Sequence, residues 1–117
     1  MVGRVSQFTL HIGPVAYNVT GERHLTTDDG GKAAGWVKHD DELIRIDAVL
    51  PKRSQHVTVL HELVHVILQQ AGQHEWYGEE GLLDCLAYGL VGAKVETEGG
   101  DCRPLLESLF VAMDEGA

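Results

Sequence analysis

The N-terminal half of the chain consists of short runs in which apolar and polar residues alternate. Residues 7–12 follow this period of two, and residues 15–20 repeat it after the turn signal Gly13-Pro14. Because successive side chains of a strand point to opposite faces of its sheet, the alternation predicts two half-buried strands. Two further apolar runs, residues 36–39 and 43–47, flank an acidic triplet and predict a hairpin.

The C-terminal half follows the period of a helix instead. Apolar residues recur every three or four positions over residues 54–71, with Ser54 as the N-cap and Gly72 as the stop. A second helix is expected over residues 78–90, and Pro104 suits the first turn of a third. Strands followed by helices predict an α+β fold, in which a small, mostly antiparallel N-terminal sheet is covered on one face by C-terminal helices.

Composition is typical of a single globular domain. The chain has 117 residues, 44% of them hydrophobic, without a repeat or a Pro/Ser-rich linker, so residues 1–117 are expected to form one domain. The formal net charge of −9 argues against nucleic acid as a partner, because nucleic-acid-binding proteins need Lys and Arg to displace counterions from phosphates. An anionic membrane surface is disfavoured for the same reason.

The sequence also indicates a cellular compartment. No stretch approaches the ~20 consecutive apolar residues of a membrane-spanning helix. The first residues lack the apolar core of a secretory signal. Cys85 and Cys102 are too few for a disulfide framework. We therefore expect a cytoplasmic protein with reduced cysteines.

The segment His61-Glu62-Leu63-Val64-His65 is the clearest sign of chemistry in the chain. On a helix, residues four apart lie on one face, so His61 and His65 can bind a single metal ion, and Zn²⁺ is the ion expected there. Glu62 lies about 100° further round the helix. From that position it can reach a water on the metal and act as a general base.

A competing interpretation is two solvent-facing histidines on an ordinary surface helix. The neighbouring residues argue against it, because apolar side chains surround the motif on almost every side and indicate a buried helix. Two imidazoles and a carboxylate in such a place need partners, since an unpaired buried polar group costs several kcal/mol. A metal ion would be a partner for all three.

The next predicted helix offers a third ligand, since a catalytic zinc site usually takes three from the protein. Glu80 and Asp84 lie four residues apart and share a face. Glu80 can bind the metal while Asp84 accepts the free ring N–H of a ligand histidine. Glu79 and Asp84 are the alternative third ligands. A negatively charged helix start explains Glu79 and Glu80 without a metal, but it does not explain Asp84 among apolar neighbours.

The two helices together resemble those of the gluzincin metallopeptidases, in which H-E-x-x-H is followed by E-x-x-x-D. The short form is similar to the minimal gluzincins and to the small anti-repressor peptidases of the ImmA/IrrE type from phages and mobile elements. The similarity spans residues 36–91. Its specific content is five residues: His61, Glu62, His65, Glu80 and Asp84. The resemblance implies zinc, a zincin-like fold and hydrolysis of peptide bonds in the cytoplasm. It also implies a sheet edge beside the metal that would hold a peptide or protein substrate as an added strand.

Peptide hydrolysis at such a site also needs a hydrogen-bond donor opposite Glu62, because the attacked carbonyl oxygen gains negative charge. His74, Tyr77 and Tyr88 are the candidates. Each also has a structural interpretation, and for Tyr88 this is a place in the core, as is usual for an aromatic at helical spacing. The other histidines, among them His39, are interpreted as surface or strand residues.

Two other functions are open on the sequence alone. The metal site could serve structure only, in an inactive anti-repressor or adaptor module that acts by protein–protein contact. Glu62 argues against this, because a structural site needs no general base and is usually closed by four protein ligands. The motif could also be accidental in a metal-free interaction domain. The substrate sequence and the oligomeric state stay open.

Overall fold

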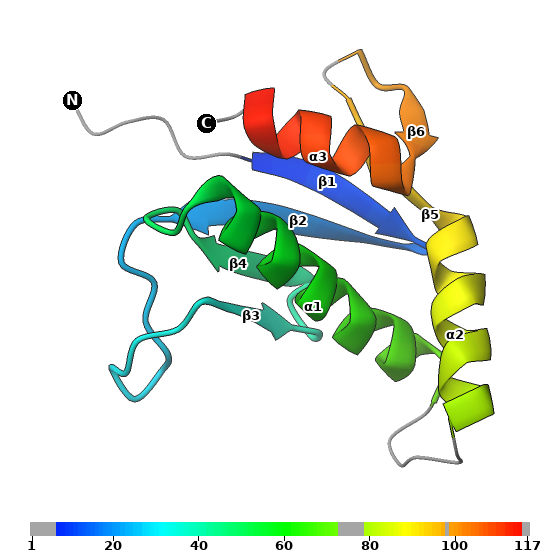
Figure 1. Cartoon of the computed structure of the whole chain (residues 1–117), viewed down its shortest axis with the longest axis horizontal. Helices are drawn as coiled ribbons and strands as arrows, with labels where there is room; N and C mark the ends of the chain where they lie inside the picture. Colours follow the sequence, from blue (N-terminus) through cyan, green and yellow to red (C-terminus); the bar gives the residue numbers. More distant parts are fainter. Residues whose placement is uncertain (1–6, 73–78, 98, 116–117) are drawn as a thin grey trace.

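A computed structural model describes residues 7–72, 79–97 and 99–115, which form a six-stranded sheet and three α-helices (Figure 1). The elements follow in the order β1 (Gln7–Ile12), β2 (Val15–Glu22), β3 (Gly35–Lys38), β4 (Leu43–Asp47), α1 (Lys52–Gln70), α2 (Glu79–Gly92), β5 (Ala93–Glu96), β6 (Cys102–Pro104) and α3 (Leu105–Glu115). The predicted α+β class is confirmed.

The strands lie in the order β3-β4-β2-β1-β5-β6. Neighbouring strands are antiparallel except β2 and β4, which run parallel with Val19 opposite Ile44. The expectation of an N-terminal sheet is wrong for β5 and β6, which follow α2 in the chain. These strands have only four and three residues, too few to show a clear alternation, and β5 is placed by its pairing with β1.

The predicted hairpin of residues 36–47 is confirmed, and the two predicted strands β1 and β2 form a second one. β1 and β2 are joined at Gly13, whose φ of +59° is a conformation that glycine adopts without steric strain. β3 and β4 pair in antiparallel register with Val37 opposite Ile44. The connection between them is closed by a hydrogen bond from the Glu42 N–H to the His39 carbonyl oxygen at 3.2 Å. Local alternation and turn residues are sufficient to specify these units.

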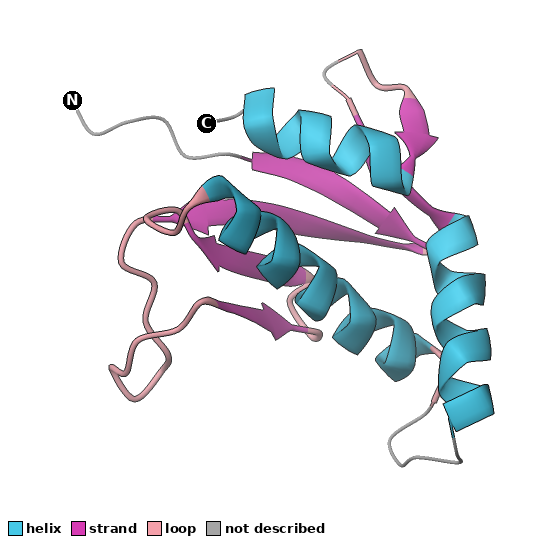
Figure 2. Cartoon of the chain, viewed as in Figure 1, coloured by secondary structure: helices cyan, strands magenta, loops and turns pink. Residues whose placement is uncertain are grey.

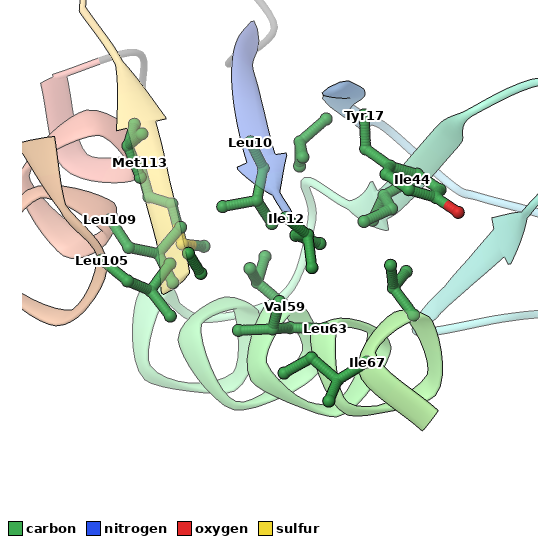
Figure 3. Packing of buried hydrophobic residues seen from close by; sticks show 14 of the residues in the cluster. Leu10, Ile12, Tyr17, Ile44, Val59, Leu63, Ile67, Leu105, Leu109 and Met113 are labelled. Atoms are coloured by element: carbon green, nitrogen blue, oxygen red, sulfur yellow. The ribbon is translucent and has the colours of Figure 1, made fainter. Parts of the chain in front are cut away.

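Helices α1 and α3 lie on the same face of the sheet, whereas α2 stands at one end and packs on α1 (Figures 1 and 2). The core fills the space between the sheet and the helices α1 and α3. Figure 3 shows Leu10 and Ile12 of β1 near Val59 and Leu63 of α1, with Leu109 of α3 in the same cluster. None of the described helices is long and apolar enough to cross a membrane.

Helix α1 begins earlier than its predicted N-cap. Pro51 precedes the first helical residue, and no side chain caps that end. The prediction that Ser54 is the N-cap is therefore wrong: Ser54 lies in the first turn, and its carbonyl oxygen accepts a hydrogen bond from the Thr58 hydroxyl at 2.7 Å. Proline suits this place because its fixed φ and missing N–H cost nothing at a helix start. The predicted stop is confirmed, since Gly72 adopts a φ of +71° directly after the helix.

Candidate metal centre

His61 and His65 stand next to each other on the outer surface of α1. Their Nε2 atoms are 3.0 Å apart and their ring centroids 4.7 Å apart. Two nitrogens that bind one tetrahedral zinc ion at ordinary bond lengths lie about 3.3 Å from each other. In this structure the two rings are hydrogen-bonded to each other, and the distance is close to that between two ligands of one metal ion.

Glu62 lies beside this pair but on the side of α1 that faces the sheet. Its side chain is only 6% exposed, and among the described residues no group donates a hydrogen bond to its carboxylate. Burial raises the pKa of the Glu62 carboxyl, and the nearby imidazoles of His65, His61 and His39 oppose that shift. A carboxylate with a raised pKa can accept a proton from a neighbouring water.

The sequence-based argument from burial is correct for Glu62 only. Both motif histidines are exposed, because α1 rests on the sheet along one face and leaves the other to solvent. The apolar residues thought to bury the whole helix lie partly on that outer face, and Val57 is exposed there. His61 and His65 thus do not need a partner to offset burial. Their mutual spacing is the remaining structural support for a metal.

The structure does not bring the predicted third ligand to these histidines. Glu80 and Asp84 are exposed. The side of α2 that meets α1 is marked by Gly89, which faces Ile67. Around the axis of α2, Glu80 lies about 180° and Asp84 about 140° from Gly89. In the described parts of the chain, no group of three or more His, Cys, Asp or Glu side chains is placed to hold a metal ion. The side chain of Glu79 lies outside the described part.

Of the predicted hydrogen-bond donors, Tyr88 alone lies in the described part of the chain. His74 and Tyr77 lie outside the described residues. Tyr88 is 86% exposed on the outer side of α2. Its interpretation as a core residue is therefore wrong, because α2 packs through the side that carries Gly89, about 100° away around the helix.

One histidine that acts electrostatically on Glu62 was missed at the sequence level. His39 follows the last residue of β3 and is half-buried. Its Nδ1 lies 3.3 Å from the hydroxyl oxygen of Tyr17, a core residue that is 3% exposed, and the two rings meet edge to face. No local signal marks this neighbourhood, because it depends on the pairing of β2 with β4, which are far apart in sequence.

Comparison of the chain with protein-family models, with curated proteins and with solved structures found no match. The case for a function therefore rests on the residues of this chain and their geometry.

Proposed function

We propose that the protein is a zinc-dependent peptide-bond hydrolase with a zincin-like site, in which His61 and His65 hold the metal and Glu62 is the general base. One observation carries the proposal: two imidazole Nε2 atoms lie 3.0 Å apart on one helix face, next to a glutamate that is only 6% exposed. A surface helix has no need of a buried, unpaired glutamate at this position, since such a group costs folding free energy.

Each residue has a distinct task in this proposal. A zinc ion supplies Lewis acidity and lowers the pKa of a water toward about 7. His61 and His65 bind the metal in their neutral form. Glu62 accepts a proton from the attacking water and passes it to the leaving amine as the C–N bond breaks. Its raised pKa makes Glu62 a stronger base toward the attacking water, and the leaving amine, which is far more basic than a carboxylate, still takes the proton up.

The position of β3 supports a peptide as the substrate. β3 is the edge strand of the sheet on the side where α1 packs. The two elements approach closely at Gly35, where an added Cβ would lie 2.6 Å from Thr58 Cγ2. Among the described strands, β3 thus leaves one edge unpaired beside the helix of the motif, and an extended peptide can add to such an edge through backbone hydrogen bonds.

The third ligand is a separate part of the proposal. We assign it to Glu80, with Asp84 accepting a ring N–H from one of the histidines. Both carboxylates point away from α1 in the present structure, so metal binding has to reposition α2. Zinc affinity measured by competition with a chelator tests this: E80Q is expected to weaken binding at least 10-fold, whereas E79Q has little effect. Equal affinities of E80Q, E79Q and the wild type would remove Glu80 from the ligand set.

Peptide cleavage by zinc-loaded, tag-free protein tests the proposed function. We expect the wild type to cleave members of a peptide library and E62Q to be slower by about 10²–10⁴-fold at equal zinc content. A wild type that binds zinc but leaves every peptide intact would favour the inactive adaptor instead. If it holds no more metal than H61A, both metal-dependent functions are excluded. The free thiols Cys85 and Cys102 support placing this activity in the reducing cytoplasm.

A further inference from the structure

The outer face of α1 presents no Asp, Glu, Lys or Arg to solvent over residues 54–70. Glu62 is the only residue of these four types in that range, and it is buried against the sheet. Val57, His61 and His65 are exposed there instead. The whole chain, by contrast, has 18 Asp+Glu against 9 Lys+Arg and a net charge of −9. Two copies of the chain therefore repel each other in general but can meet at this face, which has the low charge of an interface core.

The same face is open to a partner as large as a folded chain. Figures 1 and 2 show α1 in front of the sheet, with no described element over its outer side. His61 and His65 are exposed near the middle of the helix, with their Nε2 atoms 3.0 Å apart. The two nitrogens are therefore accessible from outside the molecule.

One chain offers too few ligands to complete a zinc site at this place. Zinc usually takes four ligands. The described residues contain no group of three or more His, Cys, Asp or Glu that is placed to hold a metal ion, and Glu80 and Asp84 point away from α1. Two copies that meet at the outer face of α1 supply two imidazoles each. A two-fold axis that passes between them gathers all four around one point.

We propose that one zinc ion joins two copies of the chain through His61 and His65 of each, and that this dimer is the closed form of the metal centre. The inference rests on the proposed function, from which it takes both ligands, and it adds a means of regulation. Four imidazoles leave no position on the metal for a water or a peptide carbonyl, so the dimer cannot hydrolyse peptide bonds. A full equivalent of zinc per chain, or dilution, separates it into monomers with an open position.

Association depends on the metal, because the protein contact alone is small. A stable interface takes about 20–30 residues from each partner, and the outer face of one helix offers far fewer. Val57, which is 61% exposed, adds only a minor apolar contact. Without zinc the protein is expected to be a monomer, in which His61 and His65 are hydrogen-bonded to each other. Zinc and dimer formation are thus thermodynamically linked.

Analytical ultracentrifugation during a zinc titration tests the proposal. The wild type is expected to sediment as a monomer with a chelator, as a dimer with half an equivalent of zinc per chain, and as a monomer again with excess zinc. H61A and H65A should stay monomeric throughout. E80Q is the matched control and should dimerise like the wild type, because Glu80 is assigned to the monomer's ligand set only. X-ray absorption at the zinc edge of the half-loaded wild type should show four nitrogen ligands.

Lysine at two exposed positions tests the face itself. V57K places a charge one helical turn from His61 and should weaken dimer formation at half an equivalent of zinc by about 10-fold or more, because two like charges then meet at the interface. A16K adds the same charge on the opposite face of the sheet, since Ala16 alternates with the buried Tyr17, and should dimerise like the wild type. Thermal unfolding with a chelator checks that each variant is folded. Equal dimer formation by V57K and A16K would exclude the outer face of α1.

Several other results would overturn the inference. These are a dimer that persists with chelator or in H61A, a protein that stays monomeric at every zinc ratio, oxygen ligands in the half-loaded protein, and full peptidase activity where the dimer predominates. Two results separate this inference from the proposed function. A zinc-linked dimer whose 1:1 monomer cleaves no peptide supports the dimer and overturns the proposed function. A 1:1 monomer that cleaves peptides and never dimerises does the reverse.

Discussion

The burial of Glu62 is energetically unfavourable for its ionised carboxylate. The chain places an ionisable carboxyl between two exposed histidines, and the fold then turns that carboxyl toward the sheet without a hydrogen-bond donor among the described residues. A buried group of this kind destabilises the folded state, and such costs are usually found where function requires them. The effect can be measured apart from catalysis, in metal-free protein.

Replacement of Glu62 by glutamine should stabilise the metal-free protein at neutral pH. Burial raises the pKa of Glu62 in the folded state, so the stability that its protonated form contributes is present below the ordinary carboxyl pKa and lost as pH rises through the folded value. At pH 7 E62Q avoids this loss and should be more stable by on the order of 1 kcal/mol. Near about pH 4, where Glu62 is largely protonated too, the difference should disappear.

Thermal unfolding with a chelator present measures this difference. The matched control is E107Q on α3, since Glu107 is exposed and its replacement should change little at either pH. Lower stability of E62Q than of the wild type at pH 7 would contradict the role of burial. E62Q should therefore be less active than the wild type and, at pH 7, more stable.

Among the elements, α2 has the weakest attachment. It packs mainly on α1, and the contact is closest where Gly89 meets Ile67, a residue of the core cluster. Leu83 and Val91 remain exposed on its outer side. The sequence predicts the existence of this helix correctly, but its apolar residues on both sides give no indication of which side meets α1.

Alanine at two glycines of α2 tests the packing. An ideal Cβ at Gly89 would lie 2.6 Å from Cγ1 and Cγ2 of Ile67, whereas one at Gly92 meets nothing within 4 Å. We expect G89A to lower the free energy of unfolding by about 1–3 kcal/mol through overpacking. G92A, the matched control, should be neutral or stabilising by up to about 1 kcal/mol. Urea denaturation measures both, and equal effects would show that α2 does not pack on α1 at Gly89.

At the scale of the whole molecule, the core is built from apolar side chains of several elements. The sheet, α1 and α3 share one apolar cluster. Asp114 of α3 also accepts a hydrogen bond from His56 of α1 at 3.0 Å and pairs with Lys52. These two interactions lower the pKa of the Asp114 carboxyl. The proposed site on the outer surface of α1 would therefore load and release metal while the fold persists.

Zinc should accordingly stabilise a protein that is already folded. The metal-free form is expected to show a cooperative thermal transition, and zinc at 100 times its Kd should add about 2.7 kcal/mol of stability. This gain should weaken in acid, because metal ligands must be deprotonated and protons compete with the metal for them. H61A is the control and should show no zinc-dependent shift. Stabilisation by zinc that survives in H61A, or at low pH, would contradict the assigned ligands.

Local patterns determined much of this protein. The alternation of residues 7–12 and 15–20 predicted β1 and most of β2, and the apolar period of α1 predicted a helix that ends at Gly72. The H-E-x-x-H spacing likewise placed both imidazoles on one side of that helix. These features depend on neighbours within about one or two turns, so the chain itself contains the information.

Only the tertiary structure decided which of the site's side chains face water and which side chains contact one another. Burial of Glu62 beside exposed His61 and His65 depends on the face of α1 that the sheet covers, and α1 has apolar residues on several sides. Likewise, His39 meets Tyr17 because β4 pairs in parallel with β2 across a long connection. Such contacts follow from the packing of the whole chain, because the free energy of burial depends on what lies opposite a residue and not on its neighbours in sequence.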